Sequence, residues 1–431
     1  MTERAQTATG KSASKAAAIV RELLQEYHPR DFAVEYWDGS RWDPEPGQFC
    51  RFTWHIHNPN IFRALLRADR QVALGEAFIH GDFDISGDIL AIFPVAEYVE
   101  QKHFGPGKKL RLGTLLLGLH AKLHDKEEAA HVELRGRTHS KLRDRQAVTF
   151  HYDVSNDFYR LWLDPAMIYS CAYFKSPDDS LETAQAQKLD YICRKLRLRS
   201  GERLLDIGCG WGGLIIHAAR YYGVQAIGIT LSEQQMTFSQ KRIKDAGLSS
   251  RCEVQLLDYR DAHQLGEFDK LTSVGMVEHV GESALQEYFR CSFQLLKPGG
   301  LFLNHGIARA GNRPKSAERT FTDIYVFPDG ELIPIPTTLG CAEEAGFEVR
   351  DVENLREHYF LTLCQWLRRV ENSMESVTNL VGELKYRIWR LYLAGSAHYF
   401  QSGKLDLYQS LLVKCVDGRS GLSLTRGDWY D

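Results

Sequence analysis

The ten residues LLDIGCGWGG at positions 204–213 constrain the fold of this chain more than any other segment. They begin as a short apolar strand, and the run GGLIIHAARYYG that follows has the pattern of a helix closed by a glycine. Gly208, Gly210 and Gly212 let the backbone turn tightly and approach a ligand without a Cβ in the way. A strand, a glycine loop and a helix in this order predict a nucleotide-type binding site.

The region from about residue 185 onward alternates helical and strand patterns. Further strands are expected at VQAIGIT, CEVQLLD, FDKLTSVGM, GGLFLNHGIA and near FEVRDV. Strands that alternate with crossover helices predict an α/β fold with a parallel sheet covered by helices on both faces. The segment LDLYQSLLVK at 405–414 is expected to add a late edge strand.

The amino-terminal region has a different pattern. Short alternating runs between residues 31 and 57 predict a small antiparallel sheet, and a helix, a turn at Gly81–Asp82 and another helix are expected over 59–100. A chain of 431 residues is too long for one small core. We therefore expect an α+β domain over 1–125, a basic linker to about residue 145, and a catalytic domain over 146–431.

The expected linker is rich in positive charge. Between residues 101 and 145, eleven lysines and arginines face five acidic residues, although the whole chain has a net charge of −3. A basic, leucine-bearing segment can bind an anionic membrane surface, or it can be a solvated connector with one amphipathic helix. The overall charge predicts no nucleic-acid partner.

The compartment can be judged from the cysteines and from the apolar runs. The nine cysteines include no CxxC pair, which predicts neither a disulfide framework nor a metal site and fits a reducing cytosol. No stretch has the apolar core of a signal peptide or the roughly 18 apolar residues of a membrane span. We expect a cytoplasmic protein that associates peripherally with the inner face of the membrane.

Three alternatives exist for the ligand of the glycine loop. Gly208, Gly210 and Gly213 also satisfy GxGxxG, which would suit a dinucleotide, but Thr230 stands where an acidic residue usually binds the ribose. The loop also carries the bulky Trp211. A structural turn without a ligand is the third alternative. The series Asp206-x-Gly208-x-Gly210-x-Gly212 resembles the first motif of class I S-adenosylmethionine methyltransferases, which we favour.

A set of further motifs narrows the resemblance. They are FHYDVSNDFYRLWLD (150–164), MIYSCAYF (167–174), GITLSEQQ (228–235), LDYRD (257–261), SVGMVEHVG (273–281) and LNHGIA (303–308). In this order they resemble the cyclopropane-fatty-acid synthase family, which includes the mycolic acid cyclopropane synthases, over roughly 145–415. The resemblance implies a Rossmann-like class I methyltransferase fold with a mostly parallel seven-stranded sheet. It also makes the smaller amino-terminal domain similar to the extra domain of phospholipid-modifying members, and it implies a homodimer.

The resemblance implies a reaction and a set of catalytic residues. The expected activity adds a methylene group from S-adenosyl-L-methionine across the cis double bond of unsaturated phospholipid acyl chains. The chemistry forms a carbocation and needs a dry site with a base. The family implies that the base is a bicarbonate ion, held by Glu278, Cys171, His305, Ile307 and Tyr359. Each of these residues also has a purely structural alternative, such as a buried thiol, a helix-start acid or a polar group at a strand end.

The residues expected to bind S-adenosylmethionine lie in the same motifs. They are Tyr169, Ser170, Asp206, Gly208, Cys209, Gly210, Trp211, Gly212, Thr230, Leu231, Ser232, Gln235, Tyr259 and Arg260. The many aromatic residues between 150 and 174 would suit an acyl tunnel whose rings stabilise a cation, although core packing is the better expectation for most of them.

Three other functions remain open. A fatty-acid methyltransferase of the same fold would leave a methyl or methylene branch, because the product depends on which proton leaves the cation. A small-molecule N-methyltransferase would need no cage around a cation, so Cys171, Glu278 and His305 argue against it. A lipid-binding or scaffold protein on a degenerate methyltransferase fold is disfavoured by the intact glycine loop.

Overall fold

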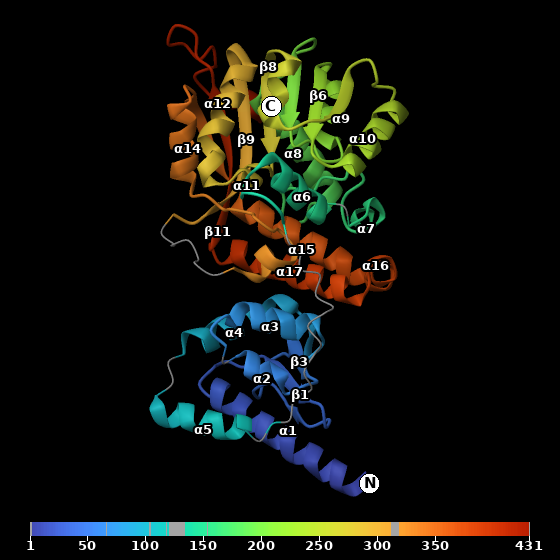
Figure 1. Ribbon diagram of the computed structural model, residues 1–431, viewed down its shortest axis with the longest axis vertical. Helices are drawn as coiled ribbons and strands as arrows, with labels where there is room; N and C mark the ends of the chain where they lie inside the picture. The colour runs from blue at the N-terminus through green and yellow to red at the C-terminus, as the bar shows by residue number, and fades with distance from the viewer. Residues whose placement is uncertain are drawn as a thin grey trace. The chain divides into compact units, whose positions relative to one another are not determined.

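The computed structural model describes residues 2–65, 67–102, 105–117, 119, 134–152, 154–311 and 319–430. These residues form two compact units (Figure 1). The first contains the described residues of Met1–His131 with residues 319–321 and Glu383–His398, and the second contains the remainder. In the described residues no helix is both long and apolar enough to cross a membrane.

The first unit is built on a four-stranded sheet in the order β2-β1-β3-β4. The strands are β1 (Phe32–Tyr36), β2 (Arg41–Trp42), β3 (Phe52–Ile56) and β4 (Phe83–Gly87). The expectation of a purely antiparallel sheet is wrong, because β1 and β3 pair in parallel, while β2 and β4 are antiparallel to their neighbours. The two-residue β2 returns along one edge of β1, so the chain places β3 on the other edge of β1. Strand β4 was not anticipated.

Helices complete the first unit. They are α1 (Thr2–Leu24), α2 (Asn60–Ala64), α3 (Arg70–Ile79), α4 (Ile92–Gln101) and α5 (Pro106–Leu117). The segment Glu383–His398 also packs here through two buried arginines: Arg387 and Arg390 contact the carboxylate of Asp84 at 2.8 and 3.0 Å. The domain boundary near residue 125 stays a prediction, and this late segment is an addition that the sequence did not suggest.

The second unit contains a seven-stranded sheet in the order β10-β11-β9-β8-β5-β6-β7. Its strands are β5 (Arg203–Ile207), β6 (Gln225–Thr230), β7 (Cys252–Leu256), β8 (Phe268–Val274), β9 (Leu296–Arg309), β10 (Glu348–Asn354) and β11 (Leu405–Val413). Strand β11 runs antiparallel to β9 and β10, and the other strands are mutually parallel. The predicted α/β class I methyltransferase fold, with its smaller amino-terminal domain, is confirmed.

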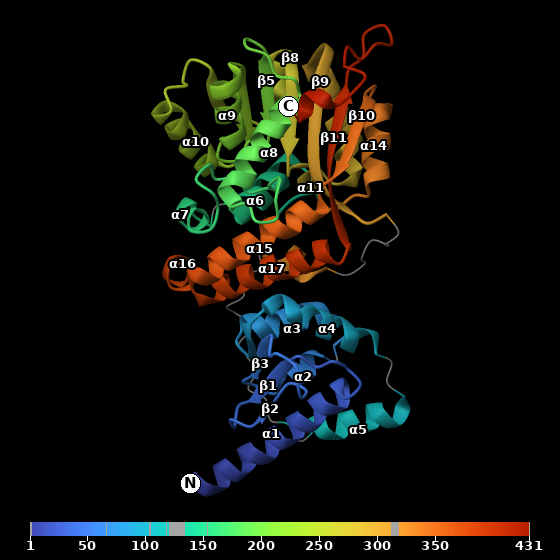
Figure 2. The same ribbon diagram turned by 180° about the vertical axis from the view of Figure 1, so that it is seen from behind.

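The placement of β11 corrects one expectation. Figure 2 shows β11 between β9 and β10, so it is an interior strand and β10 is the edge. The side chains of Leu407 and of the run Gln409–Val413 are buried, whereas β10 has no fully buried residue. Both faces of β11 are therefore covered, as is typical of an interior strand.

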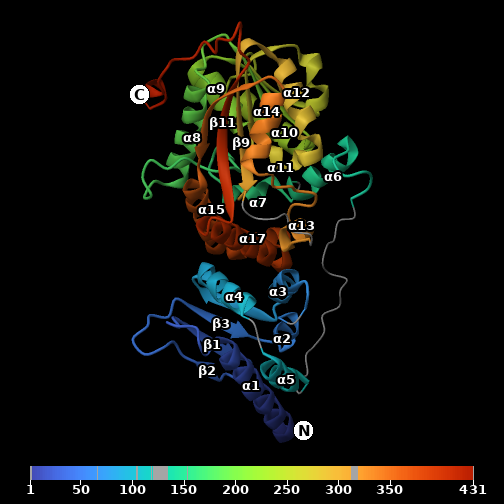
Figure 3. The same ribbon diagram turned by 90° about the vertical axis from the view of Figure 1, so that its left-hand side faces the viewer.

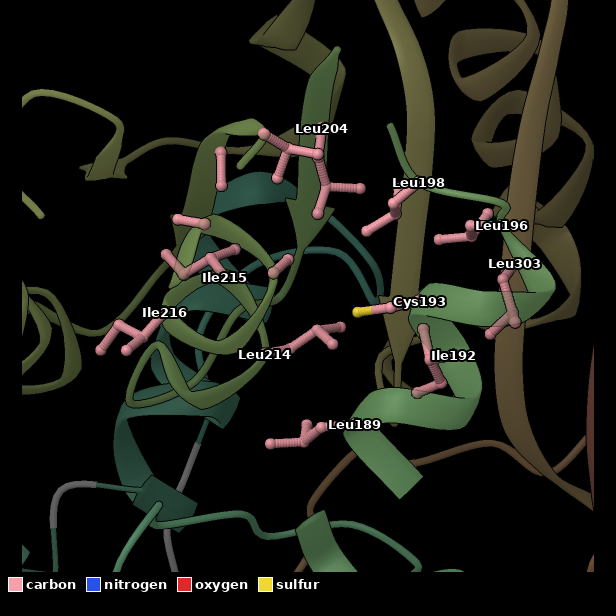
Figure 4. Packing of buried hydrophobic residues seen from close by; sticks show 14 of the residues in the cluster. Leu189, Ile192, Cys193, Leu196, Leu198, Leu204, Leu214, Ile215, Ile216 and Leu303 are labelled. Carbon is pink, nitrogen blue, oxygen red and sulfur yellow. The ribbon is translucent and has the colours of Figure 1, made fainter. Parts of the chain in front are cut away.

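Helices cover the two faces of this sheet in separate groups (Figure 3). Packed on one face are α8 (Leu181–Lys195), α9 (Gly213–Tyr222) and α10 (Glu233–Asp245); on the other are α12 (Leu285–Leu295), α14 (Ile335–Glu344) and the 3₁₀ segment η3 (Tyr259–Leu265). Alternate residues of each strand serve the two cores, so Leu204 faces α8 and α9 while Leu205 faces α12. Figure 4 shows Leu189, Ile192 and Cys193 of α8 in the same buried cluster as Leu214 and Ile215 of α9.

The remaining helices of the second unit lie mainly near the carboxyl ends of the parallel strands or in the carboxyl-terminal region. They are α6 (Lys141–Tyr152), α7 (Asn156–Arg160), α11 (Val277–Val280), η4 (Glu282–Ala284), α13 (Phe321–Tyr325), α15 (Arg356–Asn372), α16 (Met374–Val381), the end of α17 (Glu383–Gln401) and η5 (Gly427–Trp429). In open α/β sheets ligands bind beyond the carboxyl ends of the strands. The fold therefore directs the search for a site to that edge.

Candidate active site

The glycine loop joins β5 to α9 in a conformation that few other residues adopt. Gly208, Gly210 and Gly212 all have positive φ, at 82°, 53° and 78°. A Cβ added at Gly208 would come within 3.1 Å of the Met276 side chain. The amides of Gly208 and Cys209 both donate to the carbonyl of Ile229 at 3.0 Å, which fastens the loop to β6. The loop thus leaves an open space at the strand ends.

A pocket occupies this space, lined from the ends of β5, β6 and β8 and from helix α6. Twelve of the fourteen residues expected to bind the cofactor line it: Tyr169, Ser170, Asp206, Gly208, Cys209, Gly210, Trp211, Thr230, Leu231, Gln235, Tyr259 and Arg260. The other two lie beside it. Gly212 is the N-cap residue of α9, and the Ser232 hydroxyl caps α10 by accepting from the Gln235 amide at 3.2 Å. Binding by these residues stays a prediction.

Asp206 is the buried acid of this pocket. Its carboxylate accepts a hydrogen bond from the Thr272 hydroxyl at 2.7 Å, and burial raises its pKa to about 6. On the β6 side, the Thr230 hydroxyl donates to Gln235 at 2.7 Å. The pocket thus offers a carboxylate acceptor on one wall and an ordered hydroxyl–amide pair on another. Both suit the amino and hydroxyl groups of a nucleoside.

Helix α6 forms a further wall through Asp144, Val148 and Tyr152. Arg260 of η3 holds it, because the guanidinium donates to Asp258 at 2.6 Å and to Asp144 at 2.9 Å. Arg260 therefore shapes the pocket with most of its donors already engaged.

The same helix changes the interpretation of the basic linker. Lys141, Arg143 and Arg145 were counted as linker cations, yet they form ion pairs with Asp261, Asp329 and Glu233 of the second unit. Paired cations attract an anionic membrane less than free ones. Lys122 and Lys126 lie outside the described residues, so the membrane hypothesis for that part of the linker stays a prediction.

The structure joins two of the five candidate catalytic residues by a hydrogen bond and places a third on the same strand. The Ile307 amide of β9 donates to Glu278 Oε1 of α11 at 2.7 Å, and His305 lies two residues before Ile307 on β9. Among the described residues, neither Glu278 Oε2 nor His305 Nε2 has a hydrogen-bond partner, and both atoms are buried. Burial raises the pKa of Glu278 to about 7 and lowers the pKa of His305 well below its usual value.

Cys171 and Tyr359 lie together on another part of the site. The Cys171 thiol contacts the carbonyl of Leu355 at 3.9 Å, and the Tyr359 amide donates to the same carbonyl at 3.0 Å. Burial raises the pKa of the Cys171 thiol, so it is no thiolate nucleophile at neutral pH. The Tyr359 ring packs edge-on against Trp366, which in turn contacts Tyr169 of the pocket.

None of the five candidate catalytic residues is among those that line the described pocket, but each set adjoins it. Cys171 follows Ser170, Glu278 lies between the lining residues Met276 and His279, and the His305 carbonyl accepts from the Gly275 amide at 2.9 Å. The aromatic residues between 150 and 174 are divided between the pocket lining and the core. Tyr152 and Tyr169 line the pocket, whereas Phe158, Tyr159 and Trp162 are fully buried in the core. An acyl tunnel therefore stays a prediction.

Sequence reasoning missed the lysines of α8. Lys188 is buried, lines the pocket and donates to the Ser170 hydroxyl at 2.7 Å. Burial lowers its pKa to about 8. Two helical turns later, Lys195 is also buried. The signal was present in the helical phase, because positions 181, 185, 188, 192 and 195 share the buried face and two of them are lysines.

Most of the chain is similar to proteins of a known family. A family model described as mycolic acid cyclopropane synthetase matches residues 139–410. The chain belongs to this family. A second model, a domain of unknown function (DUF7884), matches residues 19–107. Membership makes the chain an S-adenosylmethionine-dependent methyltransferase.

Individual relatives of the family differ in how much of the chain they match. A probable fatty acid methyltransferase of Pseudomonas putida is 41% identical over 94% of this chain and 98% of its own length. The cyclopropane-fatty-acyl-phospholipid synthase of Escherichia coli K12 is 36% identical over 64% of this chain and 69% of its own. Among solved structures, mycolic acid cyclopropane synthase CmaA1 complexed with SAH and CTAB matches with a TM-score of 0.59 and 32% identity, covering 62% of this chain and 97% of that one.

Proposed function

We propose that this protein is a fatty-acyl C-methyltransferase, which transfers the methyl group of S-adenosylmethionine to a double-bond carbon of an unsaturated acyl chain and leaves a branch. The observation that carries the proposal is the similarity to the Pseudomonas putida probable fatty acid methyltransferase, which extends through both units, whereas the match to the cyclopropane synthase covers less of the chain. The cyclopropane product favoured by the sequence motifs becomes the second candidate.

Both products follow from one intermediate. A bond forms between the methyl carbon and one alkene carbon, the bond from sulfur to methyl breaks, and S-adenosylhomocysteine leaves. The positive charge then resides on the other alkene carbon. Loss of a proton from a chain carbon gives a methyl-branched alkene, loss from the new methyl after a hydride shift gives a methylene branch, and loss from the new methyl with ring closure gives a cyclopropane. The position of the base therefore selects the product.

The pocket residues support cofactor binding. Asp206 supplies a carboxylate acceptor, the glycine loop leaves room for the ligand, and the Thr230–Gln235 pair is pre-ordered. S-adenosylmethionine would supply an electrophilic methyl group here. Apolar side chains of Met167, Leu231 and Met276 help to exclude water from the same space.

The buried cluster supports a role in proton removal. Glu278 Oε2 and His305 Nε2 are buried without a partner among the described residues, so each has a position left for a hydrogen bond to a small anion. Bicarbonate, which the family resemblance implies, would accept the proton there. Glu278 itself, with a pKa near 7, is suited to share or receive it. Phospholipid as the acyl carrier, the inner membrane face and the homodimer belong to the same proposal.

The decisive experiment uses purified full-length protein, vesicles of monounsaturated phospholipid and S-adenosylmethionine with a deuterated methyl group. A methyl-branched alkene retains all the deuterium, whereas methylene and cyclopropane products each lose one deuterium, as mass spectrometry will show. Proton NMR of the product made with unlabelled S-adenosylmethionine then separates these two, because the ring methylene protons of a cyclopropane resonate at unusually high field. High-field proton signals would identify the product as a cyclopropane and contradict the branch-forming activity. Lipid that stays unmodified across varied acyl chains and headgroups would contradict both candidate activities.

A further inference from the structure

A chain of buried polar side chains runs from helix α8 to His305. Lys195 Nζ donates to Gln409 Oε1 at 3.0 Å, and Gln409 Nε2 lies 3.2 Å from His305 Nδ1. All three side chains are at most 1% exposed. Gln409 and His305 are direct cross-strand partners in the β11–β9 pairing, so the strand register itself holds them side by side.

Lysine determines how the amide of Gln409 is oriented. An ammonium group has three donors and no acceptor, so the amide atom that faces Lys195 must be oxygen. Lys195 is itself anchored by the carboxylates of Glu353 at 2.5 Å and Asp351 at 3.4 Å. The amide nitrogen then has to point at the histidine ring. This orientation follows from chemistry and needs no distinction between the nitrogen and the oxygen of the amide.

The amide in turn determines the tautomer of the histidine. An NH₂ group can only donate, so His305 Nδ1 must be the unprotonated acceptor. In the neutral ring the single proton then resides on Nε2. Nε2 is the buried ring atom that has no partner among the described residues.

We propose that Lys195 and Gln409 are positioning residues, which hold His305 as the Nε2–H tautomer so that it presents a hydrogen-bond donor to the anion that removes the proton. The inference rests on the proposed function for the identity of that anion, but the tautomer itself follows from the contacts alone. His305 acts in it as a neutral donor, and the proton goes to the anion beside Glu278 rather than to the imidazole. His305 lies in the motif LNHGIA, but neither Lys195 nor Gln409 belongs to a motif of the sequence.

The test reads the tautomer directly. In full-length protein labelled with ¹⁵N-histidine, long-range nitrogen–proton NMR spectra distinguish Nε2–H from Nδ1–H rings, and the signals missing from the His305→Gln variant identify this residue. We expect Nε2–H in the native protein. A native Nδ1–H or doubly protonated ring would overturn the inference.

Variants separate positioning from a merely structural role. Gln409→Glu keeps an oxygen toward Lys195 but offers His305 an acceptor, so we expect the ring to change to Nδ1–H or to become protonated. Outer hydrogen-bond partners of metal-bound histidines are typically worth about 10- to 100-fold in activity. We expect a comparable fall in kcat here, with the KM for S-adenosylmethionine unchanged. Lys195→Met should give a mixture of tautomers, because it frees the amide to turn over.

A matched control lies on the same strand. Ser410 is equally buried, but its side chain is on the opposite face of β11, so Ser410→Ala should leave the His305 spectrum and kcat as they are. A Gln409→Glu spectrum identical to the native one would refute the positioning role. If the tautomers behave as expected but no lipid is methylated, the proposed function fails and the network stands.

Discussion

The cofactor pocket and the buried cluster around Glu278 adjoin each other, yet their polar groups are treated differently. In the pocket walls, Asp206 is bonded to Thr272, and Thr230 to Gln235. In the cluster, Glu278 Oε2 and His305 Nε2 have no partner among the described residues. Unpaired buried polar groups cost roughly 1–3 kcal/mol each, so a pair of them beside a pocket is expected to bond a ligand or an ordered water.

This difference in hydrogen bonding suggests that the pocket binds the cofactor and that the cluster takes part in the reaction. The pocket is preorganised by its own hydrogen bonds, which suits a ligand bound in the same way before and after reaction. In the cluster, Glu278 Oε2 and His305 Nε2 remain able to form hydrogen bonds to a charge that develops during the reaction. Variants in the pocket should therefore change affinity for S-adenosylmethionine, and variants in the cluster should change turnover.

The strongest test of this division is Glu278→Gln. The amide keeps an oxygen for the Ile307 amide but cannot accept a proton, so we expect turnover to fall by about 100- to 10,000-fold. Calorimetry with S-adenosylmethionine should give the native affinity. Glu282→Gln, which changes an exposed acid four residues away, is the control. Substantial turnover by Glu278→Gln would show that Glu278 takes no part in the reaction, and it would contradict the division between a binding pocket and a reactive cluster.

A second test addresses the pocket with a pair of glycines. Gly208 and Gly247 both have positive φ, so alanine at either position strains the backbone by about 1–2 kcal/mol. Only Gly208 also faces the Met276 side chain of the pocket, whereas space is open at Gly247. We expect both variants to lose similar stability in urea unfolding, and only Gly208→Ala to bind S-adenosylmethionine about tenfold more weakly. Equal affinities would show that the loop geometry does not serve the cofactor.

Much of this pocket was predictable from the sequence because its determinants are local. The glycine loop, the cap at Ser232 and the strand ends at Asp206 and Thr230 each depend on residues within a few positions. Helical and strand periodicity likewise located most elements of the second unit. Local patterns carry this information reliably because backbone conformation and capping are decided by near neighbours.

What could not be predicted depends on contacts distant in sequence. The interior position of β11, the parallel pairing of β1 with β3 and the linker cations paired as α6 all involve partners far along the chain. The Lys195–Gln409–His305 chain joins residues more than 200 positions apart. A lysine on an apolar helix face signals a buried partner, but the sequence does not say which residue it is.

A third test sharpens the role of helix α6 in the pocket wall. Asp144→Asn removes the charge that Arg260 contacts at 2.9 Å, in a partly buried pair. Such a pair contributes roughly 1 kcal/mol, so we expect affinity for S-adenosylmethionine to fall about three- to fivefold by calorimetry. Arg145→Gln breaks the exposed pair of the same helix with Glu233 and should leave the affinity unchanged. Equal losses in both variants would mean that the whole helix, and not this contact, supports the pocket.

The smallest effect expected is a gain in stability. Because burial raises the pKa of Glu278 to about 7, the folded state holds its proton more tightly than the unfolded chain, whose glutamate titrates near 4.5. Stability is therefore lost as pH rises between these values, by an amount on the order of 1–3 kcal/mol. Glu278→Gln cannot ionise, so at pH 8 it should melt a few degrees above the native protein, and at pH 4 the two should coincide. A variant that is less stable than the native protein at pH 8 would show that the ionised carboxylate is well compensated where it lies, and the contrast between pocket and cluster would then disappear.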